Sequence, residues 1–346
     1  MRLRRSDLNR PGYTRRRRGK GFSYADEHGA PLTDPGQLRR LKDLVIPPAW
    51  TDVWICNDPR GHIQAVGTDQ AGRRQYRYHD VWRAKRDAAK FEHMLGVAER
   101  LPTLRARVAE DLGRRGYPKR RVLAAAVRLL DEGVFRIGGE AYASEESGSG
   151  EATFGLATLR REHVSVRGAA MEFRYPAKGG IERVQRIVDP AVAPVVRGLL
   201  RRDDDAAELL AYRDRVRGWR DVRSADINGY LREATGCQIS AKDFRTWHAT
   251  VLAAVTLADP ALPATSPSAR KRARSRAMRE VSTYLGNTPA VARASYVDPR
   301  VTDLYDEGVT VDTTLAGTPT VGAVAERYAQ ERDVAEQAVL RLLRDS

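Results

Sequence analysis

Tyr296 ends a stretch whose residue types could do chemistry, LGNTPAVARASYVDP at residues 285–299. Thr288 can cap a short helix and Pro289 suits its first position, so this helix would deliver Tyr296 nine residues after Asn287. A phenol, with a pKa of about 10, becomes a usable nucleophile when nearby cations favour its phenolate form. Taken alone, the residue is more simply a half-buried aromatic with its hydroxyl group in water.

Basic residues in three further stretches could supply those cations. FRIGGEAY places Arg136 just after a predicted helix, and PAKGG places Lys178 at the tip of a predicted hairpin. AKDFRTWHAT places Lys242 and Arg245 on one face of a helix, at positions i and i+3. A phosphodiester attacked by an oxygen nucleophile gains negative charge on its nonbridging oxygens, which arginines can stabilise. Its departing sugar oxygen needs a proton, which a positioned lysine can donate. The set therefore predicts phosphoryl transfer.

Each of these residues also has a plainer explanation. Arg136 could cap the C-terminus of its helix, and Lys178 could simply be solvated at a glycine-rich turn. Lys242 and Arg245 could lie on a solvated helix face. Asn287 could be a helix-capping residue. What favours chemistry is the occurrence of all of them together, in this order and in these settings.

The charge of the chain indicates its class of partner. The 346 residues include 60 Lys and Arg against 45 Asp and Glu, which gives a net charge of +15, and most of the basic residues are arginine. Arginine grips phosphate with a planar fork, so an extended polyanion is the expected partner. A membrane surface is the competing interpretation, but the sequence contains no run of about 18 apolar residues.

The composition argues against metals and disulfides. Only Cys56 and Cys237 are present, which excludes a disulfide framework, a cysteine-rich zinc module and an iron–sulfur cluster. The histidines show no HExxH or other close ligand spacing, so we expect no metal and no other cofactor. His248 is expected to pack or to be hydrated, and not to act as a base. The first residues are basic with no apolar stretch behind them, so we expect a cytoplasmic protein.

The elements that would position these residues change type along the chain. Residues 1–88 contain short apolar runs, DLVIPPAW, DVWICN and GHIQAVGTD, which predict strands of a small sheet. Residues 89–346 are mainly helical in pattern, with a short β-meander at HVSVR, MEFRY and IERVQRIV. Helices are also expected at AELLAYRD and over residues 321–346. The run RRRR at residues 15–18 is expected to be a disordered arm. The predicted fold class is α+β with two domains.

The order and settings of FRIGGEAY, PAKGG, AKDFRTWHAT and LGNTP resemble those of type IB DNA topoisomerases, particularly the bacterial and poxvirus-like branch. The resemblance runs over nearly the whole chain, including GFSY and GRRQYRYH near its start. It implies a tyrosine recombinase/topoisomerase IB-like fold and an enzyme that relaxes supercoiled duplex DNA through a transient 3′-phosphotyrosyl bond. Neither ATP nor a metal is implied, and the expected state is a monomer associated with the nucleoid.

Carried over residue by residue, the resemblance assigns the catalytic roles. Tyr296 would be the nucleophile, and Arg136 and Arg245 would hold the scissile phosphate. Lys178 would protonate the departing 5′-oxygen. Asn287 falls where eukaryotic and poxvirus relatives carry histidine and bacterial relatives carry asparagine, and its NH2 group could donate to a nonbridging oxygen. The accessory positions implied by the resemblance are Lys242, Gly138 and Tyr142.

For residues 1–88 the resemblance implies a β-sheet domain that closes as a clamp on DNA, with residues 89–346 as the catalytic domain. GRRQYRYH matches a Gln-Tyr-x-Tyr stretch that contacts DNA in the viral relatives. Period-2 spacing would place Tyr76 and Tyr78 on one face of a strand, with Arg74 near for phosphate. The implied DNA-binding residues are Gln75, Tyr76, Tyr78 and Arg74.

Two other functions stay open on the sequence. A tyrosine site-specific recombinase has related final motifs, but it usually carries HxxR where this chain has Lys242 and Arg245, and it begins with a helical domain. A non-catalytic basic DNA-binding protein would explain the charge of +15 equally well, but would give Tyr296 no role. Strand exchange between two specific sites would identify the first, and binding without any covalent adduct would identify the second.

Overall fold

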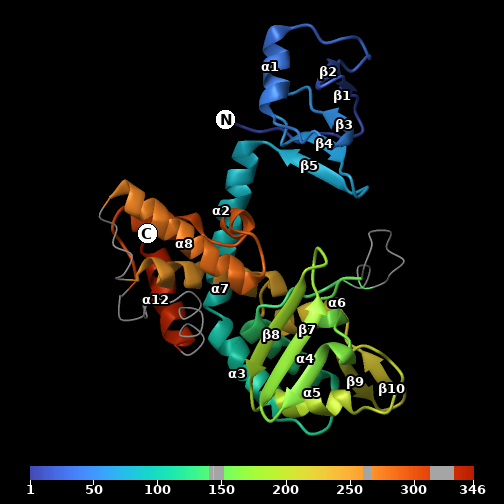
Figure 1. Ribbon diagram of the computed structural model, residues 1–346, viewed down its shortest axis with the longest axis vertical. Helices are drawn as coiled ribbons and strands as arrows, with labels where there is room; N and C mark the ends of the chain where they lie inside the picture. The colour runs from blue at the N-terminus through green and yellow to red at the C-terminus, as the bar shows by residue number, and fades with distance from the viewer. Residues whose placement is uncertain (140–142, 144–151, 260–265, 312–330) are drawn as a thin grey trace. The chain divides into compact units, whose positions relative to one another are not determined.

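The computed structural model describes residues 1–139, 143, 152–259, 266–311 and 331–346 (Figure 1). Tyr142 lies outside these described residues, and so do residues 321–330 of the predicted last helix. The chain divides into two compact units, residues 1–92 and 93–346. Within the described ranges, no helix combines the length and the apolar character that crossing a membrane requires.

The first unit is built on an antiparallel sheet. Its strands follow the order β2-β1-β3-β4-β5, and they are β1 (Tyr13–Arg18), β2 (Gly21–Ala25), β3 (Thr51–Ile55), β4 (Ile63–Thr68) and β5 (Arg74–Tyr78). Helix α1 (Pro35–Asp43) begins after Asp34, whose carboxylate accepts the N–H of Gln37 at 2.7 Å. Leu41 of this helix packs with Ile55 of β3 in the core of the unit. The predicted sheet is confirmed.

Two details of the first unit differ from prediction. Residues 44–50 of the stretch DLVIPPAW form a loop between α1 and β3, because Val45 has a φ of 47° and the two prolines after Ile46 have no N–H to donate to a strand. The run RRRR belongs to β1 and is not a disordered arm. Arg15 is only 9% exposed and donates to the carbonyls of Ile46, Pro47 and Trp50 at 2.8–3.0 Å. A charged run can thus be a strand when one of its arginines satisfies buried carbonyl groups.

The second unit is mainly helical, and the α+β class is confirmed. Helix α2 (Asp80–Ala98) passes through the boundary between the units. It is followed by α3 (Leu101–Leu112), α4 (Lys119–Gly133), α5 (Ala193–Leu200), α6 (Ser224–Thr235), α7 (Ala241–Leu257), α8 (Pro267–Leu285), α9 (Pro289–Ser295), α10 (Pro299–Asp306) and α12 (Arg332–Arg344). Helix α7 is central to the unit, because it is buried from Phe244 to Leu257 and contacts α4, α8, α10 and α12.

Two small sheets complete the second unit. Strands β6 (Val164–Arg167), β7 (Ala170–Pro176) and β8 (Glu182–Val188) form the predicted β-meander, in which β8 contacts α4 and β6 contacts α5 (Figure 1). The predicted helix at AELLAYRD is wrong, because β9 (Ala211–Asp214) pairs with β10 (Gly218–Asp221). The Asp214 carboxylate accepts the N–H groups of Val216 and Arg217 and so forms the turn. Periodicity does not separate a strand from a helix in so short an apolar run.

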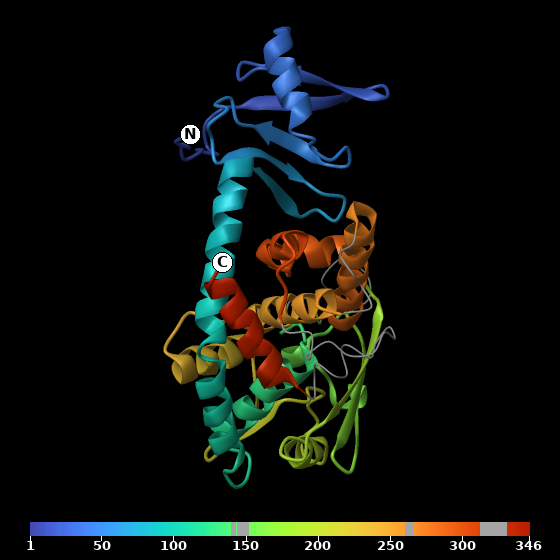
Figure 2. The same ribbon diagram turned by 90° about the vertical axis from the view of Figure 1, so that its left-hand side faces the viewer.

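Helix α12 is the red helix of Figure 2. It buries Ala335, Val339 and Leu343 and contacts α7. The prediction of a docked amphipathic helix is therefore confirmed for residues 332–344.

Candidate active site

Three arginines from different elements bind the C-terminal end of α8. Arg183 of β8 donates to the carbonyl of residue 284 at 2.8 Å, and Arg245 of α7 donates to that of residue 285 at 3.0 Å. Arg136, which follows α4, donates to the carbonyl of residue 286 at 3.2 Å. The last carbonyl groups of a helix carry partial negative charge and lack intrahelical donors, so the three guanidinium groups satisfy them. These contacts bring together residues that are up to 150 positions apart, from 136 to 286.

Arg136 reaches this point because α4 ends in an unusual conformation. Val134, the C-cap residue, has a φ of 45°, which is strained for a β-branched side chain. Its carbonyl accepts Nη1 of Arg245 at 2.5 Å. Strained residues persist where their surroundings over-determine them, and they concentrate at functional sites. Val134 therefore links the end of α4 to the arginine of α7.

Gly138 sets the course of the chain after Arg136. It has a φ of 82°, and a Cβ atom at this position would lie 2.8 Å from Oγ1 of Thr158 and 2.9 Å from Cα of Gly155. The Arg136 carbonyl accepts the N–H of Leu156 at 2.9 Å. Only glycine fits this backbone contact without displacing the segment that carries Arg136.

Asn287 is oriented by Arg136, which donates to its Oδ1 atom at 2.5 Å. A guanidinium group has donors only, so the amide atom that faces it must be the oxygen. The Nδ2 group of Asn287 is buried, and no acceptor for it exists among the described residues. Thr288, not Asn287, caps α9 by accepting the N–H of Val291. The NH2 group is therefore the part of Asn287 that a bound phosphate oxygen could engage.

Tyr296 follows the last residue of α9, as predicted, and its ring faces Arg245. The guanidinium carbon of Arg245 lies 5.2 Å from the centroid of the ring. Burial alone would raise the pKa of Tyr296, but the charges of Arg245, Arg136 and Lys242 outweigh that effect and hold the pKa below its usual value of 10.0. The shift in the pKa is in the direction that increases the phenolate fraction at a given pH.

Arg245 is itself almost fully buried, with 3% of its surface exposed. Burial lowers its pKa to about 10; Tyr296 opposes that effect, and the positive charges of Arg136 and Arg183 add to it. The group still carries its charge at neutral pH. The sequence predicts Lys242 and Arg245 on one face of a helix. In the structure their burial differs, because Lys242 is exposed and Arg245 is buried.

Thr250 contacts the backbone of Tyr296, and no pattern in the sequence indicated it. Its hydroxyl group lies 3.2 Å from the carbonyl oxygen of Tyr296 and accepts the N–H of Asp298 at 3.1 Å. Helix α7 therefore contacts Tyr296 at two points. Arg245 faces the ring of Tyr296, and Thr250, five residues later on α7, contacts the Tyr296 backbone. Arg183 was also missed, although period 2 on β8 places it on the half-buried face of the strand.

Lys178 lies where it was predicted, at the tip of the β7–β8 hairpin. The turn uses Gly179 and Gly180, with φ values of 86° and 72° that favour glycine. Lys178 is exposed, and no contact within the described ranges joins it to Tyr296. The structure brings Arg136, Arg245, Asn287 and Tyr296 together, while the role of Lys178 stays a prediction.

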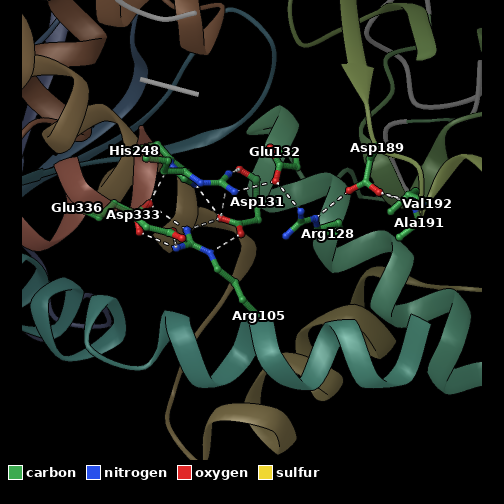
Figure 3. Close-up of polar contacts among 11 residues, drawn as sticks. Arg105, Arg128, Asp131, Glu132, Asp189, Ala191, Val192, His248, Asp333 and Glu336 are labelled. Carbon is green, nitrogen blue, oxygen red and sulfur yellow. Dashed lines mark hydrogen bonds and ion pairs between the residues drawn. The ribbon is translucent and has the colours of Figure 1, made fainter. Parts of the chain in front are cut away.

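A buried network of charges supports the helices that carry these residues (Figure 3). Arg105 of α3 contacts Asp131 of α4 at 2.8 Å and Glu336 of α12 at 2.8 Å. His248, one turn after Arg245, lies 3.1 Å from Asp131. It packs in the core as predicted. Burial would raise the pKa of Asp131, but His248 and the nearby arginines hold it well below its usual range. The network therefore joins α3, α4, α7 and α12 through paired charges.

Two further ion pairs extend this network along α4. Arg332 of α12 contacts Glu132 at 2.7 Å, and Arg128 contacts Asp189, just after β8, at 2.9 Å. Asp189 also accepts the N–H groups of residues 191 and 192. The part of the chain that the structure describes holds no cluster of three or more His, Cys, Asp or Glu side chains suited to a metal ion.

In the first unit, the predicted shared face of Tyr76 and Tyr78 is confirmed. Their rings stack with centroids 6.1 Å apart, and each side chain is 40% exposed. The guanidinium carbon of Arg74 lies 5.7 Å from the centroid of Tyr76. Gln75 is engaged elsewhere, because its Nε2 donates to Asp69 at 2.9 Å.

Comparison with known proteins decides the family. Residues 79–312 match the family described as eukaryotic DNA topoisomerase I, catalytic core, and residues 21–69 match the bacterial DNA topoisomerase IB N-terminal domain. The chain belongs to the type IB DNA topoisomerase family. The DNA topoisomerase 1B of Acanthamoeba polyphaga mimivirus is 28% identical over 301 residues, which cover 85% of this chain and 87% of that protein. The region of this chain that matches the catalytic core, residues 79–312, contains Tyr296 and the arginines beside it. It ends before α12.

Proposed function

We propose that this protein relaxes supercoiled duplex DNA by cutting one strand transiently through a 3′-phosphotyrosyl bond at Tyr296. One observation carries the proposal. The Tyr296 ring faces a buried arginine, and the surrounding cations lower the pKa of its phenol. A tyrosine that is merely a half-buried aromatic needs no such surroundings, whereas a nucleophile does.

In the proposed reaction, Tyr296 loses its proton to solvent and its phenolate oxygen attacks the scissile phosphorus. The new O–P bond forms as the bond from phosphorus to the 5′-oxygen breaks, and Lys178 donates a proton to that oxygen. The nonbridging oxygens would accept hydrogen bonds from Arg136 and Arg245, together with Nδ2 of Asn287. Lys242 supports the phenolate through its charge.

The reverse step completes the cycle. The free 5′ end rotates about the intact strand, and its hydroxyl group then attacks the phosphorus and releases Tyr296 with its proton restored. One phosphodiester is exchanged for another, so no ATP is consumed. Because cations of this chain stabilise the developing charge, the proposed reaction does not call for a metal ion.

For the DNA-binding surface we propose the face of β5 that carries Arg74, Tyr76 and Tyr78, with Gln75 beside it. Two exposed aromatic rings with an arginine over one of them offer stacking and phosphate contact together. Residues 1–88 would act as the DNA clamp and residues 89–346 as the catalytic domain of a monomer that works on chromosomal DNA. Replacing both tyrosines with alanine should weaken DNA binding, and it should leave cleavage at saturating protein near the wild-type rate.

The decisive experiment traps the covalent intermediate. A duplex whose cleaved 5′ fragment is short enough to diffuse away should leave the wild-type protein attached to the 3′ phosphate. Tyr296→Phe should bind the same duplex and form no adduct. Tyr305→Phe, which removes the hydroxyl of a different tyrosine of the same unit, should form the adduct normally. Binding without any adduct in the wild-type protein would contradict the proposal.

A second experiment separates relaxation from strand exchange. Wild-type protein should relax a supercoiled plasmid in EDTA without ATP and without a second recognition site. A requirement for two specific sites would instead identify a recombinase.

A further inference from the structure

We propose that Arg183 is a positioning residue for the cleavage step, because it ties the hairpin that carries Lys178 to the end of α8 next to Asn287. The inference rests on the proposed role of Lys178 as the proton donor.

The contact of Arg183 with α8 is close. Its Nη2 group donates to the carbonyl of Tyr284 at 2.8 Å. Gly286, with a φ of 62°, allows this approach, because a Cβ atom there would collide with Nη1 of Arg183. Arg183 is half-buried, and this burial lowers the pKa of its guanidinium group. The Tyr284 carbonyl and the side chain of Tyr175 are its hydrogen-bonding partners, so it links α8 directly to the hairpin.

Backbone pairing within the hairpin connects Arg183 to the turn that carries Lys178. Arg183 pairs with Tyr175 across the strands, and the pairing continues to Pro176 and Glu182. Beyond them the Ala177 N–H donates to the carbonyl of residue 181 at 2.9 Å, so the turn that carries Lys178 is closed by backbone hydrogen bonds. Only five positions separate Lys178 from Arg183 in the chain.

A second tie holds the hairpin further from its tip. Gln185, on the same face of β8, donates through Nε2 to the carbonyl of Gly133, and its Oε1 accepts the hydroxyl of Tyr175 at 3.2 Å. This tie joins β8 to the end of α4, and Arg183 joins β8 to the end of α8. Loss of Arg183 therefore leaves the hairpin paired and attached through Gln185, but removes the attachment nearest to Lys178.

The expected result is a misplaced proton donor. A displacement of about 1 Å from the reacting atoms can lower a rate about 10²-fold. General acid catalysis itself contributes about 10²- to 10⁴-fold. The defect of an Arg183 variant should therefore lie in the proton transfer to the 5′-oxygen, and not in binding of the phosphate.

A sulfur atom in place of the bridging 5′-oxygen tests this directly. A thiol, with a pKa of about 8.5 for cysteine, leaves as thiolate and does not need a proton from the protein. We therefore compare single-turnover cleavage of the oxygen and sulfur substrates at saturating protein. Lys178→Ala should be slower by about 10²-fold or more on oxygen and near the wild-type rate on sulfur. Arg183→Ala should be about 10- to 100-fold slower on oxygen and within about 3-fold of wild type on sulfur.

Two further variants make the result decisive. Arg186→Ala removes an exposed arginine from the same strand and should behave as wild type on both substrates. Arg183→Lys keeps a donor for the Tyr284 carbonyl and should recover part of the oxygen rate. Because the two substrates are cleaved by the same preparation, the sulfur-to-oxygen ratio is independent of how much of a variant has folded.

The outcomes separate the two proposals. If Lys178→Ala is rescued by sulfur but Arg183→Ala is equally slow on both substrates, Arg183 does not act through Lys178 and the inference is wrong. An Arg183→Ala protein with the wild-type oxygen rate overturns it as well. If sulfur does not rescue Lys178→Ala, the proposed role of Lys178 fails, and the positioning role falls with it.

Discussion

The guanidinium carbon of Arg245 lies 5.2 Å from the centroid of the Tyr296 ring, although the first residue belongs to α7 and the second follows α9. The same guanidinium group donates to the carbonyl of Val134 after α4 and to that of Leu285 at the end of α8. One buried cation thus connects the ends of two helices with the proposed nucleophile.

Replacing Arg245 with alanine should shift the pH dependence of cleavage. Its charge lowers the pKa of Tyr296, so its removal raises that pKa and decreases the phenolate fraction at a given pH. The rising limb of the rate against pH should move to higher pH. Single-turnover cleavage across a pH series measures the shift. Arg293→Ala, which removes an exposed arginine three residues before Tyr296, should leave the profile in place.

Arg136→Ala and Arg245→Ala should each lose about 3 to 4 kcal/mol of transition-state stabilisation, the effect of losing one preorganised donor at a developing charge. The measurement is the cleavage rate constant at saturating protein. For Arg136 the loss should include the contribution of Asn287, because Arg136 orients that amide. Relaxation near the wild-type rate in either variant would refute the assignment.

Asn287 should tolerate loss of its amide better than replacement by a carboxylate. Asn287→Ala removes one donor and should slow cleavage about 10- to 100-fold, as for the loss of about 1–3 kcal/mol. Asn287→Asp keeps the oxygen that Arg136 contacts but replaces Nδ2 with a second acceptor, which would repel a nonbridging oxygen. It should therefore be slower than the alanine variant. If the aspartate variant is the faster of the two, Nδ2 does not face the phosphate.

Gly138→Ala should lower both stability and activity. A Cβ atom at Gly138 would lie within 3 Å of Thr158 and Gly155, at a φ of 82°. We expect a loss of about 1–3 kcal/mol in the free energy of unfolding, together with slower cleavage as Arg136 moves. Gly168→Ala is the matched control, since Gly168 also has a positive φ, of 59°, but nothing within 4 Å of its Cβ position. Urea unfolding measures the free energy of unfolding of both variants. If Gly138→Ala and Gly168→Ala lose equal amounts, the close contact of a Cβ atom at residue 138 does not destabilise the protein.

Glu336→Gln should destabilise the protein far more than Asp333→Asn, although both carboxylates contact Nη1 of Arg105 at 2.8–2.9 Å. The side chain of Glu336 is 6% exposed and that of Asp333 is 82% exposed. Breaking a buried ion pair costs about 3–5 kcal/mol, whereas an exposed pair contributes about 0–1 kcal/mol. Urea unfolding of both variants measures the difference. Similar small losses would show that α12 is not held through this charge.

The members of the proposed catalytic cluster could be predicted because they sit in settings that short-range sequence patterns describe. Thr288 and Pro289 indicate the start of the helix that ends before Tyr296. The alternating apolar residues of the two strands on either side of PAKGG indicate the hairpin that carries Lys178. The contacts among them were not predictable. These contacts depend on which carbonyl groups at the ends of α4 and α8 lack intrahelical donors. Local sequence patterns do not indicate which distant arginine donates to each of those carbonyl groups.

The errors have a similar cause. Arg15 lies in a run that looks unstructured by charge, yet it is drawn inward by three carbonyl groups from residues 46, 47 and 50. AELLAYRD looks helical by propensity, yet pairing with β10 makes part of it a strand. In both places a long-range partner overrides the local preference.

Helix α12 follows every other described element in the chain, so it is the last of them that the ribosome makes. Until it emerges, Arg105 lacks Glu336, and α7 lacks the neighbour that packs beside His248. Unpaired charges in a core cost several kcal/mol, so the helix that carries Arg245 gains its full support only once α12 has been made. During synthesis, every residue of the proposed catalytic set is made before α12 can contact Arg105 and α7. The residues of the proposed catalytic set therefore precede, along the chain, the helix whose carboxylate completes the charge network behind Arg245.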